Sequence, residues 1–441
     1  MSDASVSGVF STLNIPEEAI TAYKEGKSAV VKQNYSQAIE HFTKALAFPD
    51  TPPLFQARSL DQRGMSAWLL NKYDEARADF LKALEICEDS ALCARLHTRL
   101  GDVADSSGDY GSALSSYTEG LRMGMEINDL LAIGRAQRGL GVVNRRQGNS
   151  EKALSHLTQA LAAFRQSADP QEQIRVLTSI GRTRQARGEY QRAISALNEA
   201  LSIAEALRDR WRVALALNDI GEAYQALYDL DKALSYHNQA LELATAAGAN
   251  MIKPDILRNL GVDHIELGRL EIGMNLLQEA LENARLLGNK EQEALTLYYV
   301  ARAYLRMGNT DKASWIVADL STLADELNAD RFRALAAFMR GELLFAQGSR
   351  VAAAAELNVA VLDAQTALDR GMLWKLHAAM SHIVDDEAIA SVHAQIAADF
   401  IQQTAEPLQD LHLKESFINA APVMAVLAAA GIDPDKLLGK K

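Results

Sequence analysis

Apolar residues recur along most of the chain in paired stretches, each with the spacing of one helix face. A representative pair begins at Ile174, and its first stretch places Ile174, Leu177 and Ile180 on one stripe. Gly188 follows, and glycine readily takes the left-handed conformation that ends a helix. A second stripe then contains Tyr190, Ala193, Ile194, Leu197, Ala200 and Leu201. Two amphipathic stretches joined by such a stop predict a helical hairpin.

The hairpin pattern returns with a period of 40 residues, and glycine marks its frame. The glycine of the first helix stands at these positions, with Ala301 in its place once: Gly101, Gly141, Gly181, Gly221, Gly261 and Gly341. A small residue follows twelve positions later: Ala113, Ala153, Ala193, Ala233, Gly273, Ala313 and Ala353. The stop glycine recurs at Gly108, Gly148, Gly268, Gly308 and Gly348, with Tyr228 as the exception. A fixed period of this length predicts a solenoid of stacked hairpins.

The small residues are expected where the two helices of a hairpin cross. A large side chain there would force the helix axes apart, at a cost of roughly 1–3 kcal/mol. Aromatic residues are placed to fill the space beside the crossings: Tyr35, Phe42, Tyr73, Phe80, Tyr110 and Tyr117.

The first two hairpins carry the residues by which the array resembles the tetratricopeptide repeat family. The family pattern is matched by Gly26, Tyr35, Ala38, Phe42 and Ala45, and again by Gly64, Tyr73, Ala76, Phe80 and Ala83. The resemblance covers roughly residues 19–380, and the longer repeats from Ala94 onward are similar to those of bacterial signalling regulators. It implies an all-α fold, a right-handed superhelical solenoid of about nine antiparallel hairpins with a degenerate capping unit at the C-terminal end.

Three parts of the chain are expected on this basis. Residues 1–18 form a flexible N-terminal segment, residues 19–370 the repeat array, and residues 371–441 a degenerate repeat and helical cap with a flexible end. Asp386 and Glu387 resemble a turn and helix start, so a long helix is expected from Glu387 to about Thr404. A cap is also physically reasonable, because the last repeat has no neighbour to cover it. Trp315 is expected to crowd the eighth repeat.

Composition narrows the classes of partner. The chain has 441 residues, a formal net charge of −12 and a pI of about 5.3, which argues against binding nucleic acid or an anionic membrane through the whole surface. No secretion signal is evident in residues 1–16, and no apolar run is long enough to span a bilayer, so we expect a soluble, cytoplasmic protein. The two cysteines, Cys87 and Cys93, are expected to be ordinary thiols.

No arrangement of residues in the sequence predicts an enzyme. Gly139 and Gly141 form part of a glycine-rich motif, but they lie within a predicted helix rather than after a strand, which argues against nucleotide binding. His237 falls on a packing position and is expected to be buried in the core. We therefore expect no catalytic residue, no cofactor and no metal.

Arginines are concentrated on the first helices of two repeats. In the tetratricopeptide resemblance these helices line the concave surface, and the basic residues there are Arg135, Arg138, Arg145, Arg175 and Arg182, with Arg95 and Arg99 extending the strip. Arginine binds carboxylates with two parallel hydrogen bonds, so the strip is suited to an acidic segment of a partner. The alternative is that these arginines pair with acidic residues on neighbouring second helices.

The later repeats carry other polar and aromatic residues on their first helices. Asn218 is polar, Arg258 and Asn259 could hold a peptide backbone, and Tyr298 and Arg302 could form anchor pockets or ordinary packing. The sequence therefore predicts a protein-interaction scaffold that binds a peptide or acidic segment in the concave groove. The alternative is a peptide-responsive sensor that changes its superhelical shape. Neither nucleic acid nor a membrane is expected as a partner, and the oligomeric state stays open.

Overall fold

The structure, a computed structural model, describes residues 15–367 and 370–439. These residues form helices joined by short turns, and no strand occurs among them. The predicted all-α class is confirmed. The chain divides into two compact units, the first made of residues Met1–Arg145 and Glu151–Pro170 and the second of Arg146–Ser150 and Gln171–Lys441.

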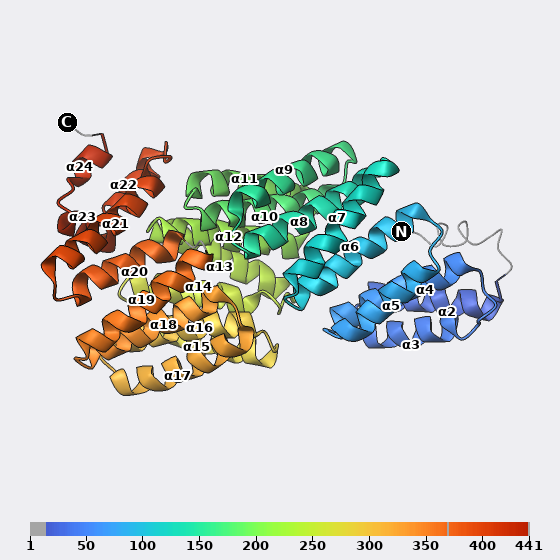
Figure 1. The fold of residues 1–441 in the computed structure, drawn as a ribbon, viewed down its shortest axis with the longest axis horizontal. Helices are drawn as coiled ribbons and strands as arrows, with labels where there is room; N and C mark the ends of the chain where they lie inside the picture. The colour runs from blue at the N-terminus through green and yellow to red at the C-terminus, as the bar shows by residue number, and fades with distance from the viewer. Residues whose placement is uncertain (1–14, 368–369, 440–441) are drawn as a thin grey trace. The chain divides into compact units, whose positions relative to one another are not determined.

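The first eight helices, drawn from blue to green in Figure 1, belong essentially to the first unit. Their bounds are α2 Glu17–Val31, α3 Tyr35–Leu46, α4 Pro53–Leu69, α5 Tyr73–Glu85, α6 Ser90–Ser106, α7 Tyr110–Glu126, α8 Leu130–Arg146 and α9 Ser150–Gln166. They form four antiparallel hairpins, as the period predicts.

The second unit contains the helices from α10 onward. Its hairpin helices are α10 Pro170–Ala186, α11 Tyr190–Ala206, α12 Arg210–Ala226, α13 Leu230–Ala246, α14 Lys253–Glu266, α15 Leu270–Leu286, α16 Lys290–Arg306, α17 Thr310–Leu327, α18 Asp330–Ala346 and α19 Arg350–Ala367. The C-terminal helices are α20 Arg370–Ile383, α21 Glu387–Ala405, α22 Leu411–Ile418, α23 Ala421–Ala429 and α24 Pro434–Leu437. The hairpins from α2 to α19 correspond to the nine expected repeats.

The turns inside the hairpins use the left-handed backbone that the stop residues predict. Gly148 and Gly188, for example, have φ values of 77° and 75°. Tyr228 takes the same conformation with φ of 58°, although it carries a side chain. A non-glycine residue in this region costs on the order of 1 kcal/mol, so the packing of Tyr228 has to compensate for it.

The frame glycines lie at the helix crossings, as expected. A Cβ atom on Gly141 would lie 2.6 Å from Cγ of Leu157, and one on Gly181 would lie 2.6 Å from Cγ of Leu197. Tyr117 is enclosed from two sides, because Cβ atoms on both Gly101 and Gly139 would collide with its ring. The two glycines on successive first helices therefore make room for one buried aromatic ring.

Successive first helices also contact one another. In the second unit these contacts join α12 to α14, α14 to α16, α16 to α18 and α18 to α20. Helices that touch across a repeat lie on the shorter, inner side of a curved stack. We call the surface formed there by α10, α12, α14, α16, α18 and α20 the inner wall.

The C-terminal helices pack back onto the fifth and sixth hairpins. The predicted long helix is confirmed as α21, and apolar residues of α21–α23 share a cluster with Tyr190, Ile194 and Leu227. The Gln191 side-chain oxygen accepts a hydrogen bond of 2.7 Å from the backbone N–H of Gln409. We call this packing of α21–α23 on α11, α12 and the turn after α12 the closing contact.

Two histidines join α20 to α21 within this region. Nδ1 of His377 lies 2.8 Å from Nδ1 of His393, so one ring donates the hydrogen bond and the other accepts it. His377 is buried, and burial together with His393 lowers its pKa to about 4. The unfolded chain therefore takes up the proton near pH 6.5, before the folded protein does.

Stability should consequently fall as the pH drops from 6.5 toward 4. His377 should contribute about 2 kcal/mol to the loss of stability at pH 5 relative to pH 7.5, because at this residue only the unfolded state gains a proton over that range. Urea unfolding at both pH values measures it. In His377→Leu this part of the pH dependence should disappear, and an unchanged dependence would contradict the assignment.

Three expectations need comment. Cys87 and Cys93 are joined by a disulfide, because the turn between α5 and α6 brings their Cα atoms within 6.0 Å, so the expectation of two ordinary thiols is wrong. Trp315 does not crowd its repeat, since it points outward from α17 and is 77% exposed. Most of the expected flexible segment lies outside the described residues, and its last two residues, 17–18, begin α2.

Candidate partner-binding surface

Ion pairs connect successive first helices along the inner wall of the second unit. The guanidinium of Arg182 on α10 donates two hydrogen bonds of 2.9 Å to the carboxylate of Asp219 on α12. Asp219 is buried, and this burial raises its pKa although Arg182 opposes the shift. The pair satisfies both groups, and it ties the fifth repeat to the sixth.

A polar network links α12 to α14. Nδ2 of Asn259 donates to the side-chain oxygens of Asn218 and Glu222 at 3.0 and 2.9 Å, and its own oxygen accepts from Arg258. Arg258 is 5% exposed and forms ion pairs with Glu222 and Asp255. Asn218, Arg258 and Asn259 therefore come together, as a shared binding surface requires, but their side chains are already engaged with one another, with Glu222 and with Gln292.

Glu266 and two arginines form the next group along the wall. Nη2 of Arg306 lies 2.8 Å from one Glu266 oxygen, and Nη2 of Arg302 lies 3.8 Å from the other. Burial raises the pKa of Glu266, but Arg302 and Arg306 outweigh it and hold that pKa below its usual range. Glu266 is therefore ionised at neutral pH.

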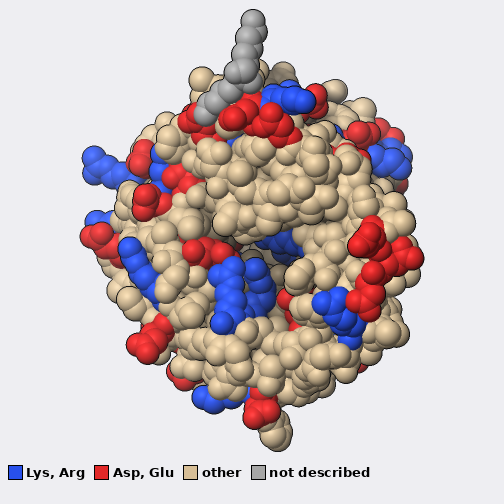
Figure 2. Space-filling model, turned by 90° about the vertical axis from the view of Figure 1, so that its left-hand side faces the viewer, with Lys and Arg blue, Asp and Glu red and all other residues tan. Residues whose placement is uncertain are grey.

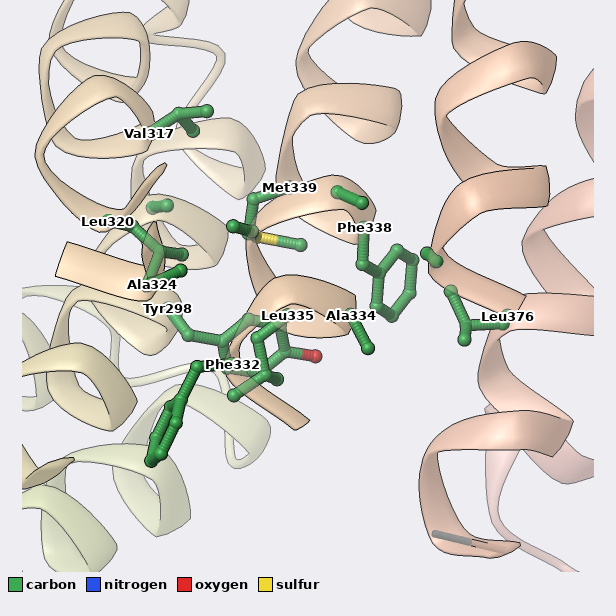
Figure 3. Close-up of a cluster of buried hydrophobic side chains, with 14 of the residues drawn as sticks. Tyr298, Val317, Leu320, Ala324, Phe332, Ala334, Leu335, Phe338, Met339 and Leu376 are labelled. Atoms are coloured by element: carbon green, nitrogen blue, oxygen red, sulfur yellow. The ribbon is translucent and has the colours of Figure 1, made fainter. Parts of the chain in front are cut away.

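Tyr298 belongs to the core of the second unit. It is 5% exposed, and its ring centroid lies 6.2 Å from that of Phe338. Figure 3 shows Tyr298 among Leu335 and Phe338, in the cluster that joins α16 to α18. Of the two roles left open for this residue, the structure places it in packing, with the guanidinium of Arg302 lying 5.8 Å from its ring centre.

Arg95 and Arg99 form a comparable group in the first unit. Both extend from α6 to the carboxylate of Asp61 on α4, at 3.2 and 2.9 Å. Asp61 is fully buried; burial raises its pKa, but Arg99 and Arg95 outweigh burial and keep the pKa low. The two arginines remain partly exposed, with side-chain fractions of 37% and 21%.

The remaining arginines of the strip divide between the units. Arg135, Arg138 and Arg145 are half-buried on α8 in the first unit, whereas Arg175 lies on α10 in the second. Arg175 lies 3.9 Å from Glu172 on its own helix, and its side chain is 52% exposed. The continuity of the strip across the two units stays a prediction.

The acidic partners of these arginines lie on other helices than the alternative supposed. That alternative pairs the arginines with neighbouring second helices, whereas Asp61, Asp219, Glu222 and Glu266 all lie on first helices. The sequence pattern did not predict these acidic partners, because the 40-residue frame relates positions only within one repeat. Acidic and basic residues at inner positions one repeat apart are the sequence signal that would have predicted them.

Two further observations concern ligands and membranes. Among the described residues, no three histidine, cysteine, aspartate or glutamate side chains gather in a way that could hold a metal ion. None of the described helices is long and apolar enough to cross a membrane.

Comparison with known proteins identifies the repeat family. The tetratricopeptide repeat profile matches residues 55–125, 132–206, 172–246 and 253–314, which together exceed half of the chain. A search of curated proteins finds none that matches the sequence.

Three solved structures share the fold. The Rap conjugation gene regulator of the plasmid pLS20, in complex with the Phr* peptide, has a TM-score of 0.57 and 17% identity, covering 80% of this chain and 96% of that chain. A Rap protein complexed with Competence and Sporulation Factor has a TM-score of 0.53 and 13% identity, covering 89% and 99%. Aspartyl phosphate phosphatase F from Bacillus subtilis has a TM-score of 0.54 and 15% identity, covering 73% and 87%. At these identities the likeness concerns the fold.

Proposed function

Because the chain belongs to the tetratricopeptide repeat family, we propose that it is a non-enzymatic interaction scaffold whose inner wall binds an extended segment of a partner protein. One observation carries the proposal: charged and amide side chains from α10, α12, α14 and α16 occupy the inner wall. An extended peptide presents one donor and one acceptor per residue. Nδ2 of the buried Asn218 has no acceptor among the described residues, whereas both N–H groups of Asn259 are already used by Asn218 and Glu222.

The partner segment carries acidic residues in this proposal. Arg175 and Arg302 bring positive charge to the inner wall of the second unit, where Arg182 is already paired with Asp219, and Arg95 and Arg99 share the one carboxylate of Asp61 in the first. A charged surface enclosed by protein attracts the opposite charge more strongly than a flat one. Two of the structural neighbours were solved with a bound peptide or factor, which supports peptide binding as the role of such a solenoid.

Arg175 provides the test, because the fifth hairpin offers a matched control. Arg175→Glu on α10 should weaken binding of a fluorescent, amidated peptide of alternating glutamate and serine by about tenfold. Arg192→Glu on α11 makes the same charge change on the outer helix, at a side chain that is 68% exposed, and should change affinity by less than about twofold.

Fluorescence anisotropy at several salt concentrations measures both effects. Binding to the unaltered protein should weaken as salt rises, since the attraction is electrostatic, and Arg175→Glu should flatten that dependence. Equal losses in the two variants would indicate that overall charge, rather than the inner wall, attracts the peptide, and would contradict the proposal.

A second candidate function is a peptide-responsive sensor. The closing contact favours it, because a change in the stacking of the fifth to ninth hairpins would have to strain or break the packing of α21–α23 on α11 and α12. Small-angle scattering with and without saturating acidic peptide distinguishes the candidates. A changed profile supports the sensor, and an unchanged one supports the scaffold.

A further inference from the structure

The second helix of the ninth hairpin, α19, exposes an uncharged face to solvent. We call the second helix of each hairpin its outer helix. Val351, Val359 and Leu362 on α19 are 85%, 45% and 65% exposed. Spacings of three and four residues place the exposed side chains on one face, which consists of Val351, Ala352, Ala355, Asn358, Val359, Leu362, Gln365 and Thr366. This face contains no acidic or basic residue.

The 40-residue frame shows that the other outer helices differ from α19. At the positions of Val351, Val359 and Leu362, every outer helix from α9 to α17 carries at least one acidic residue. These residues are Glu151, Glu199, Asp231, Glu242, Glu271, Glu279, Glu282, Asp311 and Asp319. On the face shown in Figure 2, Lys and Arg residues lie beside Asp and Glu residues around most of the rim. A charged outer surface is therefore usual for this array, and α19 departs from it.

The outer helices before and after α19 add exposed apolar side chains. Trp315 on α17 is 77% exposed, and Ile389 and Val392 on α21 are 48% and 57% exposed. All three lie in the first half of their helices, as Val351 does on α19. Together with the face of α19 they expose on the order of 500 Å² of apolar surface. Exposed apolar surface of this extent is typical of an interaction site.

The lack of charge favours a second copy of this chain as the partner. Where two identical surfaces meet about a two-fold axis, each side chain near the axis lies close to its own copy. An acidic residue there faces another acidic residue, and like charges so placed oppose association. The net charge of −12 adds a general repulsion between two copies. The outer face of α19 lets two copies meet without bringing carboxylates together, whereas the outer faces of α11, α13, α15 and α17 do not.

We propose that the outer face of α19 is a self-association surface, through which two copies of the chain form a symmetric dimer. The two α19 helices run antiparallel, with the two-fold axis between Ala355 and Asn358. Val351 of one copy then lies opposite Leu362 of the other, and the small side chain of Ala355 lets the helices approach closely. A stable interface buries about 800 Å² on each partner, so this smaller surface supports a reversible dimer. The inference is independent of the proposed function, because first helices form the inner wall.

Sedimentation equilibrium of the full chain, from about 1 to 200 μM, should show a monomer–dimer equilibrium with a dissociation constant in the micromolar range. Val359→Glu and Leu362→Glu introduce the residues that α15 carries at the same positions, Glu279 and Glu282, so the fold should tolerate them. Each should raise the dissociation constant more than about tenfold. Leu286→Glu on α15 is the control, because it places the same charge at a leucine that is 86% exposed outside the surface, and it should change that constant by less than about twofold. Circular dichroism should show equal helical content in all variants. A monomer at every concentration, or equal weakening by all three variants, would overturn the proposal.

Charges of opposite sign test the antiparallel arrangement. Val351→Glu mixed with Leu362→Lys sets a glutamate opposite a lysine, so the mixture should associate several-fold more tightly than either variant alone. Val351→Glu mixed with Val351→Lys leaves the two charges on the order of 16 Å apart along the helices, where salt screens them, and should gain less than about twofold. Equal recovery in both mixtures, or recovery in the second alone, would refute the antiparallel dimer.

Discussion

Gly139→Ala should lower the free energy of unfolding of the first unit by about 2–3 kcal/mol. A Cβ atom at this position would lie well inside contact distance of Cε1 and Cζ of Tyr117. The ring cannot withdraw, because Gly101 lies against it from the preceding first helix and its hydroxyl donates a 2.8 Å hydrogen bond to Asp102. The helical preference of alanine over glycine, about 1 kcal/mol, offsets only part of this loss.

Thermal and urea unfolding followed by circular dichroism measure the effect, with Gly111→Ala as the control. Gly111 lies on α7, where the nearest atom to an added Cβ is Oδ1 of Asp109 at 3.8 Å, so alanine there should be neutral or slightly stabilising. Adding Tyr117→Leu to Gly139→Ala should recover part of the loss, since leucine occupies the equivalent position at Leu157 and Leu197. A melting temperature for Gly139→Ala at or above that of the unaltered protein would refute the role of this contact.

Asp263→Ala should cost about 3–5 kcal/mol, which is the larger of the two effects. Asp263 and His237 are both fully buried, and a carboxylate oxygen of Asp263 lies 2.6 Å from Nδ1 of His237. Its other oxygen accepts a 2.7 Å hydrogen bond from Gln225. Removing the carboxylate leaves the buried imidazole without its acceptor and the Gln225 amide with one acceptor instead of two, and an unsatisfied buried group is strongly destabilising.

Replacing both partners by apolar residues should be much less harmful. The double variant His237→Leu with Asp263→Val restores the residues found at the same frame positions elsewhere, such as Leu157 and Val143, and should lie within about 1 kcal/mol of the unaltered protein. Gln225 keeps an acceptor in the backbone oxygen of Asn259. Urea unfolding of the single and double variants forms a mutant cycle, and additive losses would show that the two residues do not interact.

The fold was predictable because each helix crossing requires a small residue, and these residues recur in the sequence at a fixed period. Gly141, Gly181 and the stop residues mark positions where one side chain too many would prevent a hairpin from closing, and their period is visible without a structure. The burial of His237 followed from the same frame. Its partner Asp263 did not, because the two residues lie in different repeats, and the frame by itself relates positions only within a repeat.

The partner-binding surface was less predictable for the same reason. Arg182, Arg258 and Arg302 were placed on the inner side from their spacing, but spacing does not reveal how much of each guanidinium is already occupied. That depends on whether an acidic side chain one repeat away reaches hydrogen-bond distance, as Asp219 does for Arg182 and Glu266 does not for Arg302. The nitrogen–oxygen distance is 2.9 Å for Arg182 and 3.8 Å for Arg302, and the packing of the stacked helices sets both.

The closing contact also changes how the second unit can fold. In an open array each repeat contacts only its neighbours, so folding can begin at any repeat and spread along the chain. Here Gln191 meets Gln409 across 218 residues, and ordering that contact requires closure of a long loop. Such distant contacts slow the search for the native state and remove partly folded forms in which one end of the array has frayed. The closing contact should therefore slow folding, and it should make the fifth to ninth hairpins and the C-terminal helices unfold as one cooperative unit.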